Sequence, residues 1–281
     1  MIELVLTTYN RLYYTKLALA SILADPHEEF ALTIWDNAST DGTVEYLKNE
    51  VRDRRIADIL FSNQNVGQTA AINDVWARSK ADLLGKVDND CLVTAGWTRT
   101  LAKAHKDIDN LGVVACWHFF PEDFDYEKAR HKIRQFGNHQ IFCHPWTCGT
   151  GLLIKRETFK KFGRIEKSAT TGYWLKMAAA GCINGFYYPL IYQEHMDDPR
   201  SVHSGCHTTS FDEAYKHSYG YQTGAIKDIE QYKKLHEDIL ENLLTGPTDT
   251  SYYCGWRAKC RRTAGRIKNK IYALRNGTND A

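Results

Sequence analysis

The stretch GKVDNDC, residues 85–91, closes an apolar run with two aspartates that flank one asparagine. The carboxylates of Asp88 and Asp90 repel each other and add nothing to burial, so their position at the end of this run needs a reason. A divalent cation would neutralise both, since one or two carboxylates together with substrate phosphates usually hold Mg²⁺ or Mn²⁺. Asp and Asn are also common turn residues. The triplet alone leaves a metal site and a plain turn open.

Short apolar runs alternate with longer helical patterns through the first half of the chain. This order predicts an α/β fold, a mostly parallel central sheet flanked by helices. We expect strands at 2–7, 32–36, 59–62 and 83–87. Helices are expected at 12–24 and 69–79, and a further helix should begin after Asp41 as its N-cap. Ligands of open α/β sheets bind outside the carboxyl ends of the strands. The polar stretches LTTYNR, WDNASTDGT, SNQNVGQ and VDNDC should therefore meet at one edge.

The second half of the chain has a less regular pattern. It predicts a strand at 113–118, an excursion over the site at 119–138, strand character at 141–155 and a last strand at 186–193. Helices are expected at 157–162 and at 174–180, the latter ending at Gly181. No internal repeat or low-complexity linker interrupts this order.

The composition is that of a globular protein, with 43% hydrophobic and 25% charged residues in 281, which excludes general disorder. No apolar run reaches about eighteen residues, and the N-terminus lacks a basic flank and a small-residue cleavage site. We therefore expect a cytoplasmic protein. Eight cysteines without a CxxC pair argue against a zinc cage and a secreted disulfide framework.

The C-terminal residues 251–281 are strongly basic, with eight Lys or Arg and the single acid Asp280. Apolar residues recur there at intervals of three and four, which predicts a helix over 252–276 with basic flanks. Such a helix is typical of peripheral contact with anionic lipid. Docking on the rest of the chain or on a partner subunit, and solvated disorder, stay open as alternatives. Nucleic acid is not expected as a partner, since the remaining residues carry net negative charge and no reader motif.

Six ordered motifs connect these observations: LTTYNR, DNASTDGT, NVGQTAAIN, VDNDC, GTGLLIKRETF and PLIYQEH. Together, over about residues 2–195, they resemble the inverting family 2 glycosyltransferases of the GT-A fold. The resemblance implies an enzyme that uses Mn²⁺ or Mg²⁺ and a nucleotide-diphosphate sugar as donor. It also implies a glycan or lipid-linked glycan as acceptor.

The resemblance implies a donor site at the strand ends. Tyr9 would stack on the nucleotide base, Asp36 would accept from its ring N–H, and Asp88 would touch the ribose. The full set implied to bind the nucleotide sugar is Thr7, Thr8, Tyr9, Arg11, Asp36, Asn65, Gly67, Gln68, Asp88 and Asn89. The implied metal ligands are Asp90, His195 and Asp88. Each has a plainer alternative, such as an Asx-turn at Asp36, a core tyrosine at Tyr9 or a solvated side chain at His195.

The family pattern breaks at the catalytic base, the carboxylate that removes the acceptor proton. Relatives carry a Glu-Asp pair about eleven residues before the glycine equivalent to Gly181, where this chain has Ala169 and Thr170. Asp198, Glu166 or Asp197 could serve instead, or the enzyme could retain configuration without a conventional base. The segment 130–146 is expected to line the acceptor side, although its aromatic residues could simply pack the core.

These inferences give a GT-A domain at 1–210, with a nucleotide-sugar half at 1–110 and an acceptor half at 111–210. A helical, basic extension at 211–281 follows. We expect a glycosyltransferase of bacterial surface polysaccharide synthesis, cytoplasmic and peripheral on the inner face of the cell membrane. A catalytically silent nucleotide-sugar binding or scaffold protein of the same fold is the alternative. A nucleotidyltransferase fits less well, since LTTYNR is no Gly-rich phosphate loop.

Overall fold

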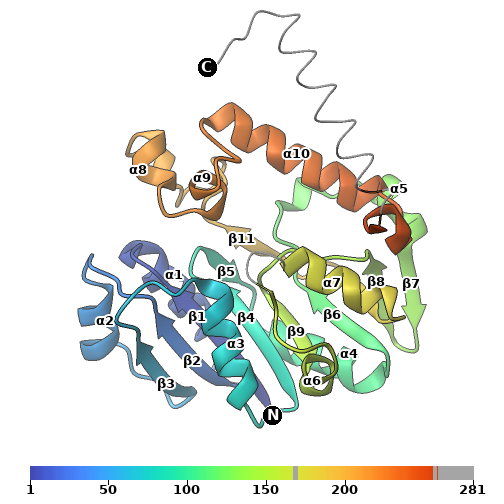
Figure 1. Cartoon of the computed structure of the whole chain (residues 1–281), viewed down its shortest axis with the longest axis horizontal. Helices are drawn as coiled ribbons and strands as arrows, with labels where there is room; N and C mark the ends of the chain where they lie inside the picture. The colour runs from blue at the N-terminus through green and yellow to red at the C-terminus, as the bar shows by residue number, and fades with distance from the viewer. Residues whose placement is uncertain (167–169, 256–257, 259–281) are drawn as a thin grey trace, which may run out of the picture.

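A computed structural model describes residues 1–166, 170–255 and 258 of the chain. Within these residues, a nine-stranded sheet runs in the order β3-β2-β1-β4-β9-β6-β10-β8-β7, and β11 and β5 form a separate two-stranded sheet. Helices cover both faces of the large sheet (Figure 1). This is the α/β architecture that the sequence predicted.

The first half of the sheet is parallel, and its pattern follows from short apolar runs that end in polar residues. The strands are β1 (Ile2–Thr8), β2 (Ala31–Asp36), β3 (Ile56–Phe61) and β4 (Leu83–Asp88). They alternate with α1 (Leu12–Ile22), α2 (Thr43–Asn49) and α3 (Gln68–Arg78). All three pairings within this group are parallel, so the polar stretches after these strands meet at one edge, as predicted.

The start of α2 differs in one detail from the prediction that Asp41 is its N-cap. The N-cap residue is Gly42, at φ 92°, and it makes no side-chain capping bond. Asp41 instead accepts from the backbone N–H of Thr43 at 3.2 Å and of Leu12 at 2.8 Å. A carboxylate beside two helix starts satisfies donors of both, which ties α2 to α1.

The second half of the sheet is mixed. Its strands are β6 (Leu111–Ala115), β7 (Ile133–Phe136), β8 (His139–Cys143), β9 (Leu152–Lys155) and β10 (Ile183–Tyr188). β9 is antiparallel to both β4 and β6, while β6 and β10 are parallel. The backbone of Gly85 makes the β4–β9 approach feasible, since a Cβ there would lie 2.5 Å from Leu153.

The predicted last strand at 186–193 is two strands, and this is a correction. β10 ends at Tyr188, the Tyr188–Pro189 peptide is cis, and β11 (Gln193–His195) begins after the turn. β11 pairs antiparallel with β5 (Cys91–Val93). Pro189 was the signal for this break within an otherwise apolar run, because proline cannot donate to a strand ladder.

Two hydrophobic cores hold the helices on the sheet. One contains buried side chains of α1, α2 and α4 (Trp97–Asp107), and the other those of α3, α6 (Arg156–Phe162), α7 (Thr170–Ala179) and α10 (Ile229–Thr245). The short helices are α5 (Tyr126–Ala129), α8 (Phe211–Tyr215) and α9 (Tyr219–Gln222), with 3₁₀ turns η1 (Pro121–Asp123), η2 (Arg130–Lys132), η3 (Gly205–His207) and η4 (Thr250–Tyr252). Opposite faces of one sheet therefore have separate cores.

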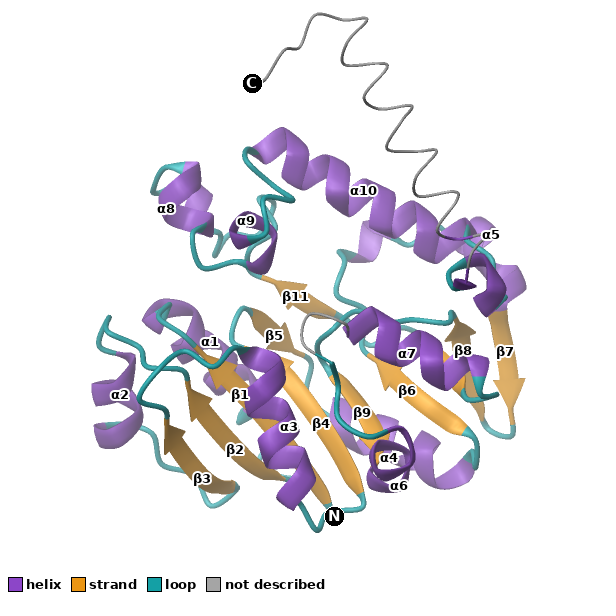
Figure 2. Cartoon of the chain, viewed as in Figure 1, coloured by secondary structure: helices purple, strands orange, loops and turns teal. Residues whose placement is uncertain are grey.

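The extension after residue 210 is helical where the structure describes it, in α8, α9 and α10. Figure 2 shows these helices on the side toward which the arrowheads of β1, β2 and β4 point. Most of the predicted basic helix at 252–276 lies outside the described residues. Among the helices that are described, none combines the length and apolarity that crossing a membrane requires.

Candidate functional site

The site forms where β4 ends, because a second strand pair brings a distant segment to it. Antiparallel pairing of β11 with β5 sets His195 opposite Cys91, and the backbone N–H of Met196 donates to the carbonyl of Asp90 at 2.8 Å. His195 Nε2 then lies 3.8 Å from Asp90 Oδ1. The structure thus joins Asp90 and His195, two of the ligands that the sequence analysis named.

The cluster fits a divalent cation. Ligand atoms of Asp90, Cys91 and His195 lie within 4.8 Å of one another. Two ligands that share an ion at about 2.1 Å each stand roughly 3 to 4 Å apart, which the 3.8 Å between Asp90 and His195 satisfies. Burial raises the pKa of the Cys91 thiol well above its usual range, and Asp90 and Asp88 add to this. The neutral thiol is a poor ligand for a hard cation, so the oxygen and imidazole ligands dominate.

Arg11 is a cation already built into this cluster. Its Nη1 donates to Asp90 Oδ2 at 2.8 Å, and its Nη2 is ion-paired with Asp197. Although burial opposes its charge, Asp197 and Asp90 raise the pKa of Arg11 above its ordinary value. Its backbone has φ 77°, a left-handed conformation uncommon for a side chain other than glycine. Arg11, which is predicted to bind the nucleotide sugar, contacts the carboxylates of Asp90 and Asp197 in the structure.

Asp90 has one oxygen that Arg11 does not contact. Burial alone would raise the pKa of Asp90, but His195 and Arg11 outweigh it and lower the pKa below its usual value. Arg11 occupies Oδ2, while Oδ1 faces His195. The ionised carboxylate therefore presents Oδ1 toward the imidazole, and the neutral Cys91 thiol donates to that oxygen at 3.5 Å.

Asp88 has a different environment from Asp90. Burial raises its pKa and the charge of Asp90 adds to the effect, against an ion pair with Lys86 Nζ at 2.8 Å. Gln68 Nε2 donates to the same Oδ1, and the Asp88 backbone N–H donates to the hydroxyl of Thr150. Asp88 is thus held toward α3. Lys86 was not among the predicted site residues, although a lysine inside an apolar strand was a signal for it.

The predicted base-binding residues lie on β1 and β2. Asp36 is fully buried, and its Oδ1 accepts from the backbone N–H of Ser39 at 3.0 Å. Its Oδ2 has no hydrogen-bond partner among the described residues. The Asx-type turn at Asp36 is therefore real, and one carboxylate oxygen still stays unused. The ring of Tyr9 meets that of His217 edge to face, at 5.4 Å between centroids.

Several other residues that were predicted to bind the donor make contacts within the protein. Thr8 and Asn89 are buried, and Asn89 Nδ2 donates to the hydroxyls of Thr8 and Thr15 at 3.2 and 3.1 Å. These contacts favour an internal, structural role for both. Thr7 is buried at the end of β1, and Asn65 accepts from the backbone N–H of Gly67 at 2.9 Å, which is turn chemistry at the start of α3.

The three candidates for the catalytic base are separated by the fold. Asp198 lines a cavity of about 250 Å³ with Tyr232 and His236, and neither Asp197 nor Glu166 lines that cavity. Burial would raise the pKa of Asp198, but hydrogen bonds from Arg200 lower it overall, so Asp198 is ionised. Asp197 is ion-paired with Arg11, and Asp198 with Arg200 at 2.8 Å. Glu166 is exposed in the loop after α6.

The place where relatives carry the Glu-Asp pair is only partly described. Thr170 begins α7, and Ala169 lies outside the described residues. The segment 130–146 was expected to line the acceptor side, but two of its histidines, His139 and His144, are buried. His139 contacts Asp107 Oδ2 at 2.9 Å, and His144 contacts Lys132 Nζ at 2.8 Å. Burial lowers the pKa of His144 to about 2, so it packs as a neutral ring.

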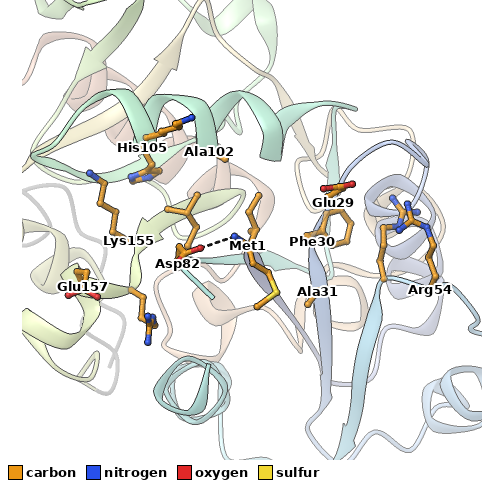
Figure 3. Close-up of a pocket in the computed structure, with 15 residues that line it drawn as sticks. Met1, Glu29, Phe30, Ala31, Arg54, Asp82, Ala102, His105, Lys155 and Glu157 are labelled. Carbon is orange, nitrogen blue, oxygen red and sulfur yellow. Dashed lines mark hydrogen bonds and ion pairs between the residues drawn. The ribbon is translucent and has the colours of Figure 1, made fainter. Parts of the chain in front are cut away.

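A larger cavity, of about 930 Å³, lies at the other edge of the sheet. Its lining includes the starts of β1, β2 and β4, and Figure 3 shows Met1, Asp82 and His105 beside it. The N-terminal ammonium of Met1 pairs there with Asp82 at 2.9 Å. Volume alone does not identify a site, and the clustered acids and imidazole lie at the carboxyl ends of the strands instead.

A sheet of this order with paired acids after β4 and a facing histidine defines a GT-A type glycosyltransferase fold. The chain belongs to glycosyl transferase family 2, whose family model matches residues 3–169. An uncharacterized glycosyltransferase of Nostoc sp. is 25% identical over 197 residues, which cover 65% of this chain. The matched part spans 58% of that relative's length.

Solved structures share the fold. The mannosyltransferase PcManGT from Pyrobaculum calidifontis, in complex with GDP-Man and Mn²⁺, superimposes with a TM-score of 0.59 at 16% identity, covering 97% of this chain and 80% of that one. TarS from S. aureus gives a TM-score of 0.50 at 16% identity, covering 70% and 37%. At these identities the likeness concerns the fold alone.

Proposed function

We propose that this chain transfers a sugar from a nucleotide-diphosphate sugar to a hydroxyl of a glycan or lipid-linked glycan. The single observation that carries the proposal is the pairing of β11 with β5. It holds an imidazole 3.8 Å from an ionised carboxylate at the carboxyl edge of the sheet. A family 2 match over residues 3–169 supports the same reaction class.

The metal proposal assigns Asp90 and His195 as ligands of Mn²⁺ or Mg²⁺, with Asp88 on the donor side. A bound dication would supply charge neutralisation to the departing diphosphate. The solved relative PcManGT contains GDP-Man and Mn²⁺, which supports the choice of metal and donor class. Arg11 keeps Asp90 ionised and fixes its second oxygen, so it orients the carboxylate toward the ion.

The donor proposal places the nucleotide base against Tyr9 and the free Oδ2 of Asp36. A flat aromatic ring accepts any base by stacking, whereas a buried carboxylate oxygen without a partner favours a ring N–H. Gln68, which reaches Asp88 from α3, would border the ribose and phosphates. Asn65 and Gly67 would shape the turn beside them.

For the proton transfer we propose Asp198 as the base, ahead of Glu166 and Asp197. It is an ionised carboxylate in a cavity that also contains the aromatic ring of Tyr232. Aromatic walls and a carboxylate suit a sugar that stacks its apolar face and donates a hydroxyl. The stereochemical course stays inverting in this proposal.

A catalytically silent nucleotide-sugar binding protein remains the second candidate, favoured by the residues at 169 and 170, which are not acids. Hydrolysis of a panel of nucleotide sugars with Mn²⁺ or with chelator separates the two. Turnover that requires Mn²⁺ and is lost in Asp90→Asn supports the enzyme. Binding of a nucleotide sugar without turnover of any donor, with or without acceptor extract, supports the silent protein.

The setting of the reaction is also a proposal: bacterial surface polysaccharide synthesis, with peripheral membrane contact through 252–276. The support is the basic, amphipathic sequence of that segment. The full chain should co-sediment with vesicles that contain anionic lipid, whereas a chain that ends at residue 250 should not. Equal sedimentation of the two would remove the membrane part. We also propose that residues 1–110 form the nucleotide-sugar half and residues 111–210 the acceptor half.

A further inference from the structure

α10 contacts the proposed metal site through the side chain of Tyr232. The helix begins after Asp228, whose side chain accepts from the backbone N–H of Gln231 at 2.7 Å. Tyr232 follows in the first turn and is 5% exposed. Its hydroxyl lies 3.3 Å from Nδ1 of His195, 37 residues earlier in the sequence. The region that the family model matches ends at residue 169, well before this helix.

We propose that Tyr232 is a positioning residue for the metal ligand His195. The inference rests on the proposed function, because it concerns the same dication. The imidazole can offer a lone pair at Nε2 only when its proton is on Nδ1, and that N–H then needs an acceptor. Tyr232 Oη is at hydrogen-bond distance from it. When a metal occupies Nε2, the hydroxyl therefore stabilises the tautomer that has its proton on Nδ1.

Ring packing holds the imidazole in the same orientation. Tyr232 and His236, one helical turn apart on α10, stack with centroids 4.2 Å apart. His236 lies nearly parallel to His195 at 6.1 Å, and His118 meets His195 edge to face at 6.0 Å. Rotation of the His195 ring would break the bond to Tyr232. The fixed ring keeps the 3.8 Å separation from Asp90.

A consequence follows for the helical extension. A group that orients a metal-bound histidine commonly changes metal affinity by about 10- to 100-fold. Since Tyr232 belongs to α10, docking of α10 and binding of the dication are thermodynamically linked. The extension after residue 210 is on this basis part of the metal centre rather than an independent appendage.

The test uses the full chain and Mn²⁺ alone as the probe, with the dissociation constant measured by electron paramagnetic resonance. We expect Tyr232→Phe to weaken Mn²⁺ binding by about tenfold or more. Tyr215→Phe is the matched control, since it also removes a buried hydroxyl, one that donates to the Asp197 backbone carbonyl at 2.8 Å. The rings of Tyr215 and Tyr232 are 5.3 Å apart, so both variants remove a hydroxyl from the same aromatic cluster and keep its rings.

The outcomes are distinct. A loss in Tyr232→Phe alone, at equal thermal stability of the two variants, supports the positioning role. Unchanged affinity in Tyr232→Phe, or an equal loss in both variants, overturns it. As a second readout, ¹⁵N spectra of the Mg²⁺-bound protein should show the His195 proton on Nδ1, and a proton on Nε2 refutes the proposal. If the wild type binds Mn²⁺ no better than Asp90→Asn, the proposed metal function fails as well.

Discussion

Replacing Arg11 by methionine removes the cation between two buried carboxylates and keeps most of the apolar volume. The side chains of Arg11 and Asp197 are 9% and 4% exposed, and that of Asp90 is 16% exposed. Loss of one partner from a buried ion pair costs about 3–5 kcal/mol, because the remaining charge is left uncompensated. We expect the metal-free Arg11→Met protein to lose stability by about that amount.

Metal should restore part of this loss. Mn²⁺ on Asp90 would compensate the same carboxylate that Arg11 neutralises, so added metal should stabilise the variant more than the wild type. Urea unfolding followed by circular dichroism, with chelator and with saturating Mn²⁺, measures both differences. Lys16→Met is the control on the same helix: its exposed pair with Glu50, at 3.9 Å, should contribute less than about 1 kcal/mol.

The pH dependence has a definite sign. In the wild type the pKa of Asp90 is lowered, so its contribution to stability is present above the unfolded-state pKa and is lost as pH falls through the folded one. Arg11→Met removes one of the two charges that lower this pKa, so the pKa of Asp90 is higher in the variant and protonation on acidification relieves its uncompensated charge. The difference between the two proteins should therefore shrink on acidification from pH 7 toward 4. A metal-free variant within about 1 kcal/mol of the wild type at pH 7 would refute the reasoning.

Three further changes test other parts of the molecule. Asp198→Asn should lower sugar transfer by roughly 100-fold or more with Mn²⁺ affinity unchanged, since it removes a proton acceptor; retained transfer rates would exclude Asp198 as the base. Burial lowers the pKa of His105 to about 3, so the unfolded chain gains a proton below pH 6.5 that the folded chain rejects. When the pH falls from 7.5 to 5, the free energy of unfolding of His105→Gln should therefore decrease by about 2 kcal/mol less than that of the wild type. Urea unfolding measures both decreases, and equal decreases would contradict this. Gly85→Ala should destabilise by about 1–3 kcal/mol, because its Cβ would lie 2.8 Å from the Leu152 carbonyl oxygen; a melting temperature like that of the wild type would contradict the close β4–β9 contact.

Several features of the fold were predictable because their causes are local. The first four strands are short apolar runs followed by turn residues, and each appears within a few residues of its predicted place. Asp36 and Asp88 each end one of these strands, so parallel pairing alone brings them to the same edge of the sheet. The second half was less predictable, because β9 pairs antiparallel with both β4 and β6, and such non-local pairings leave no periodic mark in the sequence.

The contacts of individual polar residues were harder to predict from the sequence than their position near the site. Asn89 and Arg11 stand in motifs that the family uses for the donor, yet Asn89 bonds to Thr8 and Thr15 and Arg11 to two carboxylates. Side-chain direction depends on the surrounding elements, here α1 and the segment after β11. His139 and His144 were misassigned for the same reason, since only the packed structure reveals their burial.

The sequence by itself determined the paired acids after a buried strand and the order of motifs around them, since hydrophobic runs and turn residues act over a few neighbours. Only the tertiary structure decided which groups face Asp90. Pairing of β5 with β11 spans about a hundred residues, and the docking of α10 adds Tyr232 behind His195. Such contacts follow from burial of whole elements against one another, and no short stretch of the chain encodes them.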